Sequence, residues 1–144
     1  MRHFLKISMI FLAVSLAIFA VSCDNKLDNQ IIINTHIDFT ILPNSLEYQE
    51  LNVTGGYMYL TGSGDSYGII VYRYQPDEFM AYDRKPFYNK NCPNNRLYVN
   101  FPFIVDDCNN WEYNIINGYN MSGDGTHIYW YQTVFDGTTL RVHN

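Results

Sequence analysis

The chain has 144 residues and a formal net charge of −5, with 16% charged and 17% aromatic residues. This hydrophobic composition excludes a disordered chain, and the lack of any Lys/Arg cluster argues against a nucleic-acid partner. The aromatic content, with 13 Tyr and 9 Phe, favours β-strands. The length suits one domain and not two.

The N-terminus has the pattern of an export signal. A basic start precedes an apolar run over residues 7–21, which is shorter than the roughly 20 residues of a membrane-spanning helix. Residues 20–23 read A-V-S-C and resemble the lipobox of bacterial lipoproteins, in which the cysteine is lipidated and becomes the first residue after cleavage. The resemblance implies a signal peptide over residues 1–22 and a lipid on Cys23. The alternative is an ordinary secretory signal with a chance cysteine.

Lipidation at Cys23 would anchor the chain in the cell envelope, to the inner or the outer membrane, facing the periplasm or the outside. Two acyl chains make such an anchor stable. The polar residues after the cysteine indicate a tether, so that residues 23–30 hold a domain of residues 31–144 off the bilayer. Two further cysteines, Cys92 and Cys108, remain in a compartment that permits disulfides, and pairing is their simplest state. Two free thiols are the alternative.

Short strand patterns follow one another along the domain, and no amphipathic helix of ten residues or more is predicted. The predicted strands are 31–42, 57–60, 68–74, 78–82, 96–100, 103–105, 112–116, 127–135 and 138–142. Gln75-Pro76-Asp77 and Asp136-Gly137 are typical of hairpins, and Asn117-Gly118 of a tight turn. The sequence therefore predicts an all-β fold, a small antiparallel β-sandwich or barrel.

Five segments carry a second resemblance. They are G-I-I-V-Y-R-Y (68–74), D-E-F-M-A-Y-D-R (77–84), Y-N-I-I-N-G (113–118), S-G (122–123) and the C-terminal stretch 131–144. In their order they resemble the Rieske iron–sulfur fold, in particular the small Rieske-like lipoproteins of Bacteroidetes-type bacteria. In that family a C-x-H box follows a strand like the second segment, and a C-x-x-H box precedes one like the third. The two Cys and two His hold a 2Fe–2S cluster.

This chain departs from the family at every ligand position. Residues 85–88 read K-P-F-Y where the first box belongs, and residues 106–109 read D-D-C-N where the second belongs. The degenerate ligand positions are Pro86, Tyr88, Asp106 and Asn109. No histidine lies between His36 and His127, so the loops cannot supply the imidazoles of a Rieske centre. We therefore expect neither a cluster nor any other cofactor.

The same resemblance implies a role for the remaining cysteines. Some Rieske proteins carry an extra cysteine after each ligand position, and these two join the loops by a disulfide. Cys92 and Cys108 fall on those positions, allowing one inserted residue for Cys92. A loop of about 15 residues closed in this way is worth about 3 kcal/mol in the chain-entropy model. We further expect the rings of Phe87 and Trp111, with Pro86 and Tyr88, to pack where the cluster would lie.

Other candidate sites are weak. His36, His127 and His143 fall in different predicted strands without metal-ligand spacing, so surface or hydrogen-bonded histidines are expected. The adjacent carboxylates Asp106 and Asp107 would point to opposite faces of a strand, and a solvated loop is the simpler interpretation. No nucleophile triad, phosphate loop or H-E-x-x-H pattern is present, so no enzymatic activity is predicted.

The strands are rich in large aromatic residues. Half of them should face the core and half the outside, with core packing favoured for any one. The residues concerned are Tyr57, Tyr59, Tyr72, Tyr74, Tyr129, Trp130 and Tyr131. Exposed Tyr and Trp favour contact with protein or sugar.

The sequence thus predicts a membrane-anchored envelope lipoprotein with a degenerate, cluster-free Rieske-like domain. Its role would be non-catalytic, either binding or structural, for example as an accessory subunit beside another envelope protein. One alternative is a Rieske electron-transfer protein that still holds 2Fe–2S. A second is a surface lipoprotein that binds glycans through exposed tyrosines.

Overall fold

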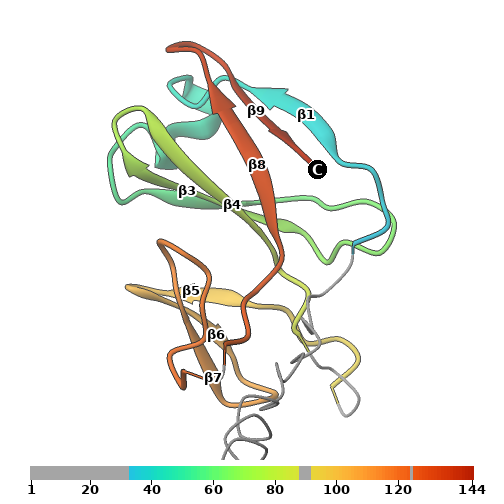
Figure 1. Cartoon of the computed structure of the whole chain (residues 1–144). Coiled ribbons are helices and arrows are strands. Elements are labelled where there is room, and N and C mark those ends of the chain that lie inside the picture. The colour runs from blue at the N-terminus through green and yellow to red at the C-terminus, as the bar shows by residue number, and fades with distance from the viewer. Residues whose placement is uncertain (1–32, 88–91, 124) are drawn as a thin grey trace, which may run out of the picture.

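The computed structural model describes residues 33–87, 92–123 and 125–144, and the fold is all-β, as predicted (Figure 1). The described elements are β1 (Asp38–Ile41), η1 (a 3-10 helix, Leu46–Leu51), β2 (Tyr57–Leu60), β3 (Ile69–Gln75), β4 (Glu78–Asp83), β5 (Tyr98–Asn100), β6 (Phe103–Asp106), β7 (Trp111–Asn114), β8 (Trp130–Phe135) and β9 (Leu140–His143). The predicted signal peptide, Cys23, the tether and Tyr88 lie outside the described residues. They stay predictions.

The strands form two antiparallel sheets. Six strands pair in the order β1-β9-β8-β4-β3-β2 and curl into a half-barrel, while three pair in the order β5-β6-β7. Figure 1 shows the smaller sheet lying against one end of the larger one. We call residues 33–83 and 128–144 the body, and residues 84–87, 92–123 and 125–127 the tip. The chain enters the tip after β4 and returns to the body before β8.

The predicted turns are confirmed. Pro76 and Asp77 connect β3 to β4, whose last pair is Gln75 opposite Glu78. The turn between β8 and β9 is closed by the Asp136 amide, which donates to the Thr139 carbonyl at 3.1 Å. Both hairpins thus form where Pro and Gly residues interrupt the strand pattern.

Strand β3 is buried on both faces, which explains its nearly continuous hydrophobic sequence. Ile69 and Val71 face a core inside the body, together with Leu51, Leu140 and Val142. The alternate residues Ile70 and Tyr72 face a second core that includes Leu97, Ile104, Tyr113, Ile115 and Ile128. Successive side chains of a strand point to opposite faces, so this one strand contributes to two cores. The second core joins the tip to the body.

A glycine allows the tip to approach β4 closely. Gly118 has a φ of +73°, in the left-handed region that glycine adopts readily. A Cβ atom there would lie 3.0 Å from Cε1 of Tyr82 and 3.2 Å from Cγ1 of Ile128. The Asn117-Gly118 turn is therefore required both for its backbone conformation and for packing of the tip.

The two longest predicted strands are much shorter in the structure than expected. In the described part of 31–42, only Asp38–Ile41 is a strand, because the amides of Asn34 and Thr35 donate to the Asp65 carboxylate and not to a neighbouring strand. Within 127–135 the strand starts at Trp130, because Ile128 N–H donates to the Gly118 carbonyl while the chain crosses from tip to body. Side-chain and loop contacts thus replace the ladder at these ends.

Candidate functional site

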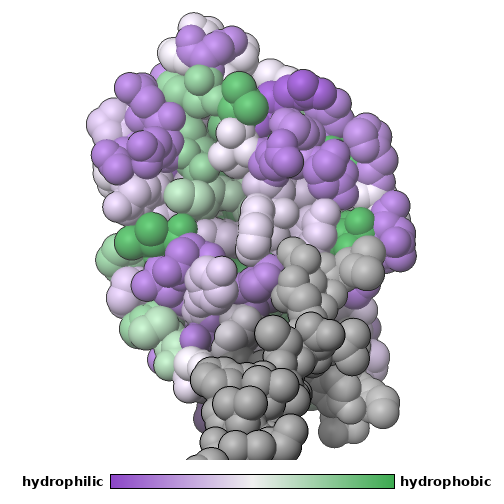
Figure 2. Space-filling view, in the orientation of Figure 1, coloured by the Kyte–Doolittle hydropathy of each residue, from purple (hydrophilic) through white to green (hydrophobic). Residues whose placement is uncertain are grey.

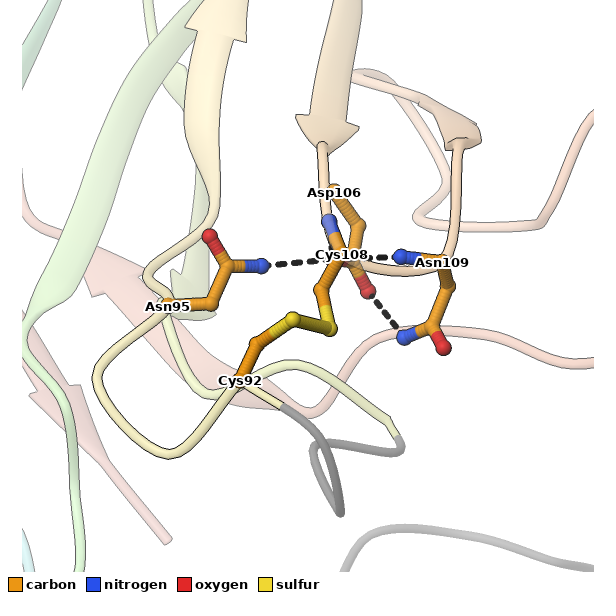
Figure 3. The surroundings of a disulfide bond; sticks show 5 residues. All are labelled: Cys92, Asn95, Asp106, Cys108 and Asn109. Atoms are coloured by element: carbon orange, nitrogen blue, oxygen red, sulfur yellow. Dashed lines mark hydrogen bonds between the residues drawn. A yellow bond between two sulfur atoms is a disulfide. The ribbon is translucent and has the colours of Figure 1, made fainter.

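The two loops of the tip meet at a disulfide. Cys92 and Cys108 are bonded, with their Cα atoms 6.0 Å apart (Figure 3). The first loop follows β4 and leads to β5, whereas the second is the turn between β6 and β7. The structure thus contains the pair that the sequence predicts, and this bond joins the two segments in which the Rieske resemblance places its ligands.

A buried carboxylate lies beside that disulfide. Asp106 is fully buried, and its Oδ1 accepts hydrogen bonds from Asn95 Nδ2 at 2.6 Å and the Cys108 amide at 3.0 Å. Its Oδ2 accepts from Asn109 Nδ2 at 2.7 Å, and the Asn109 amide points to Oδ1 at 3.4 Å. Figure 3 shows the Asn95 side chain reaching it from the other loop. This group of polar contacts, the Asp106 knot, links the loops a second time.

The knot corrects one expectation and supports another. Asp106 does not lie in a solvated loop: as the last residue of β6 it points inward, and the four donors replace the water that its carboxylate would otherwise need. Asp107 points outward, as strand alternation predicts, and accepts from Tyr98 Oη at 2.9 Å. The sequence gives no sign that Asn95 takes part, because it lies 11 residues away in the other loop.

The ligand positions implied by the resemblance do not fit a Rieske cluster. Pro86 is buried and has no ligating atom, and Asp106 and Asn109 bond to each other. Cys92 and Cys108 use their sulfur atoms in the disulfide. A Rieske centre requires two thiolates and two imidazoles, and these loops offer neither. Within the described residues, no group of three or more His, Cys, Asp or Glu is arranged to hold a metal ion.

Aromatic rings pack beside the two loops, as expected in part. The ring of Phe87 lies 6.1 Å from that of Trp111, and Trp111 lies 6.4 Å from Tyr113 in an edge-on arrangement. Phe87 and Trp111 are half-buried, while Tyr113 is fully buried in the second core. Phe87 and Trp111 thus connect the first loop to β7, in line with the expected packing. The Tyr88 ring is outside the described residues.

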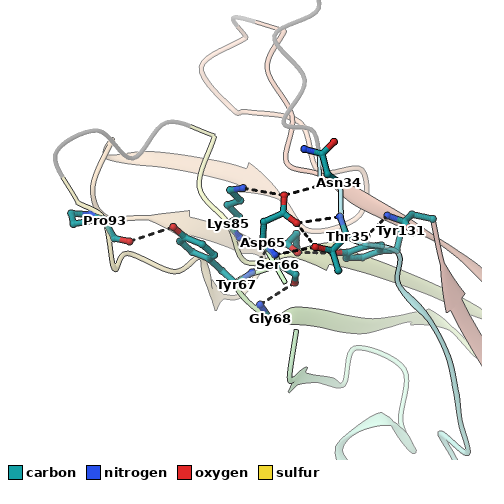
Figure 4. Close-up of polar contacts among 11 residues, drawn as sticks. Asn34, Thr35, Asp65, Ser66, Tyr67, Gly68, Lys85, Pro93 and Tyr131 are labelled. Carbon is teal, nitrogen blue, oxygen red and sulfur yellow. Dashed lines mark hydrogen bonds and ion pairs between the residues drawn. The ribbon is translucent and has the colours of Figure 1, made fainter. Parts of the chain in front are cut away.

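A second buried carboxylate, that of Asp83, holds the start of the first loop. Asp83, the last residue of β4, accepts from Tyr131 Oη at 2.6 Å and from the amides of Lys85 at 2.7 Å and Tyr67 at 3.1 Å. Burial, and then the hydrogen bond to Asp83, raise the pKa of Tyr131 far above its ordinary value. Figure 4 shows Tyr131 beside Ser66 and Thr35 in this polar region. The phenol stays protonated and acts as a donor.

The histidines do not form a common site. His127 is buried, and its Nδ1 lies 3.0 Å from the Ile128 carbonyl oxygen. Its ring packs between Tyr119, at 5.5 Å, and Trp130, at 4.6 Å. His143 ends β9 between Asp38 of the edge strand β1 and Gln132 of β8, and His36 is exposed just before β1. His127 is therefore a packed and hydrogen-bonded histidine, as predicted.

The predicted aromatic strands divide between core and surface, again as expected. Tyr72 and Tyr131 are buried, whereas Tyr59 and Trp130 are exposed. Trp130 lies at the edge of an apolar cavity of about 270 Å³, where β4 and β8 meet the 116–119 turn. The cavity is lined by Met80, Ala81, Tyr82, Ile116, Asn117, Tyr119, Trp130 and Tyr131. Figure 2 shows hydrophobic residues on the visible face at the level where body and tip meet.

Sequence reasoning missed this cavity because its residues come from three separate segments. Tyr119 and Trp130 are 49% and 44% exposed, so two large rings stand at its rim. Burial raises the pKa of Tyr82 well above its ordinary value, which keeps the phenol neutral at the base. The cavity can hold the apolar face of a small ligand.

No family model, curated protein or solved structure matches this chain. In the described residues, no helix has the length and apolar character needed to cross a membrane.

Proposed function

We propose that this chain is a non-catalytic, cluster-free binding protein of the bacterial cell envelope, anchored by lipid on Cys23. The observation that carries the proposal is the Asp106 knot. The Rieske resemblance places a cluster ligand at this position, and here a buried carboxylate accepts from Asn95, Cys108 and Asn109. Residues that bond to one another in this way serve to hold two loops together.

The disulfide supports the same interpretation. In the family that the sequence resembles, the extra cysteine pair lies beside a metal cluster that also joins the loops. Here the disulfide and the knot join segments 92–95 and 106–109. The role that follows is that of an accessory subunit, which presents a rigid recognition surface to an envelope partner.

The cofactor content tests this proposal. The full chain, purified from bacterial envelopes in detergent, should be colourless and contain no stoichiometric iron or acid-labile sulfide. Absorbance above 400 nm, with iron and sulfide near two per chain and the spectrum of a histidine-ligated centre, would establish the electron-transfer alternative instead. A bona fide Rieske protein expressed in the same cells controls for cluster assembly.

The anchor requires a test of its own. Cells grown with labelled palmitate should incorporate the label into the wild-type chain and not into Cys23→Ser, whereas Cys92→Ser should remain labelled. Equal labelling of wild type and Cys23→Ser would contradict lipidation at this residue.

A second candidate function is glycan binding at the apolar cavity. Exposed Tyr119 and Trp130 hold His127 between them, and such ring faces suit the C–H faces of a sugar. Neutral oligosaccharides on an array should bind saturably to wild type, and Trp130→Ala should lose that binding. Val134→Ala is the matched control, because Val134 is also exposed on β8 and lies outside the cavity. Equal binding by both variants would reject the cavity as a sugar site.

A further inference from the structure

A second cavity, polar in character, lies between the start of the tip and the edge of the body. Its volume is about 240 Å³. The side chains that line it include Tyr59, Thr61, Ser66, Arg84 and Arg96. Two arginines thus line one small cavity of a protein whose net charge is −5.

Arg84 is held in a fixed position within this cavity. Its Nε donates to the Leu97 carbonyl at 2.8 Å, and its guanidinium carbon lies 4.1 Å above the centroid of the Tyr59 ring. Tyr59 is itself positioned, because its Oη accepts from the Val99 amide at 2.9 Å. The two terminal nitrogens of Arg84 make no hydrogen bond to the described residues, so their donors are available to a ligand.

The neighbouring carboxylates form their hydrogen bonds and ion pair with groups other than the two arginines. Asp65 accepts from Thr35 and pairs with Lys85 at 3.9 Å, and the Thr35 hydroxyl holds its pKa below the ordinary value (Figure 4). Asp83 is bonded to Tyr131 and to two backbone amides. No carboxylate of the described chain lies within ion-pair distance of Arg84 or Arg96.

Arg84 and Arg96 bring two like charges to the same cavity. Partial burial lowers the pKa of Arg84; the Tyr59 phenol acts in the opposite direction, and the smaller effect of the Arg96 charge lowers the pKa. Arg84 is half-buried and Arg96 is exposed, so a bound anion would offset the repulsion between the two charges and replace the water lost around Arg84. Guanidinium groups bind carboxylate, sulfate and phosphate through paired, charge-assisted hydrogen bonds.

We propose that this cavity binds the oxyanion group of a small, sugar-sized polar molecule. Arg84 and Arg96 bind the anion, and Thr61 lines the space for the polar remainder of the ligand together with Ser66, whose hydroxyl also accepts from the Gly68 amide at 3.2 Å. The cavity is separate from the apolar cavity beside Trp130, with which it shares no lining residue. The inference goes beyond the proposed function and does not depend on the absence of a cluster.

Titration calorimetry on the full chain in detergent tests it, with D-glucuronate, inorganic phosphate and the neutral sugar D-glucose as probes. Glucuronate or phosphate should bind saturably, and glucose should not. Binding of glucuronate but not phosphate assigns an acidic saccharide, and the reverse assigns a phosphate-bearing ligand. Arg96→Gln should weaken the binding about tenfold or more, since one charge-assisted contact is lost.

Arg141→Gln is the matched control, because this exposed arginine pairs with Asp38 on the far edge of the body. It should bind the anions as wild type does. Arg96 makes no hydrogen bond or ion pair with the described residues, and a circular-dichroism melt equal to that of wild type shows that its variant is folded. Absence of saturable anion binding, binding of glucose as strong as that of glucuronate, or full binding by folded Arg96→Gln would overturn the proposal.

Discussion

In the body, ten buried apolar residues from five strands, the 3-10 helix η1 and the segment before β1 form one core. The tip has only four buried apolar residues in the core that it shares with the body. Those four are Leu97, Ile104, Tyr113 and Ile115. A sheet of three strands with so few buried side chains gains little from the hydrophobic effect alone. The Cys92–Cys108 disulfide and the Asp106 knot are concentrated in this part of the molecule. The difference shows how a small unit with few buried apolar residues can be ordered by specific cross-links.

Truncating the body core should have the largest effect. Leu140→Ala removes a fully buried side chain of β9 and leaves a cavity, so the free energy of unfolding should fall by about 2–5 kcal/mol. Urea denaturation of the full chain in detergent measures it. Val134→Ala, on the exposed side of the same hairpin, should change the stability by less than about 0.5 kcal/mol. Similar losses for both variants would contradict the placement of the body core.

Removing the disulfide should destabilise the tip above all. Cys92→Ser together with Cys108→Ser opens a loop of 15 intervening residues, and the free energy of unfolding should fall by about 3 kcal/mol. Hydrogen exchange should show a greater loss of protection in β5, β6 and β7 than in β3 and β4. Reduced wild-type protein should behave like the double variant. Uniform loss of protection over both sheets would contradict the separate role of the bond in the tip.

Removing the Asp106 knot should have the third-largest effect on stability. Asp106→Ala leaves the Cys108 amide and the Asn95 side chain without their acceptor in a buried place, which should lower the free energy of unfolding by about 1–3 kcal/mol. Asp106→Asn keeps one acceptor oxygen and should lose less. Asp107→Ala, next to it and exposed, should remain close to wild type in thermal melts. If Asp107→Ala were the more damaging change, the knot would not be what holds the loops.

The sequence predicts the body better than the tip, for a physical reason. Hairpins at 75–77 and 136–137 and the strands around them follow from local turn residues and alternation, which act over a few positions. The docking of the tip depends on β3 being buried on both faces, and single-strand alternation cannot show what covers the second face. The Asn95–Asp106 bond joins residues 11 positions apart in different loops, and Arg84 and Arg96 lie 12 positions apart in one loop that brings both to the same cavity. Such contacts depend on the tertiary fold and leave no local pattern.

The smallest effect concerns a carboxylate at the opposite end of the molecule from the knot. Asp136 Oδ1 accepts from the amides two and three residues later, Thr138 at 2.9 Å and Thr139 at 2.6 Å. Asp106 makes the same two bonds with Cys108 and Asn109. The two loops therefore share one local motif, exposed in the body hairpin and buried in the tip.

At Asp136 the motif is exposed, so the effect of its hydrogen bonds on the carboxylate pKa can be measured there without deep burial. Hydrogen bonds from the Thr139 amide and hydroxyl, with that from Thr138, lower the pKa of Asp136 from 3.8 to about 2. Because the folded-state pKa is the lower one, the stabilisation is complete above the unfolded pKa near 4 and is lost as the pH falls toward 2. Carboxyl NMR titration should find this pKa, and Thr139→Val, which deletes the hydroxyl donor at 2.7 Å, should raise it toward 3.8. An Asp136 pKa near 3.8 in the wild type would show that the shared hydrogen bonds do not hold the charged form.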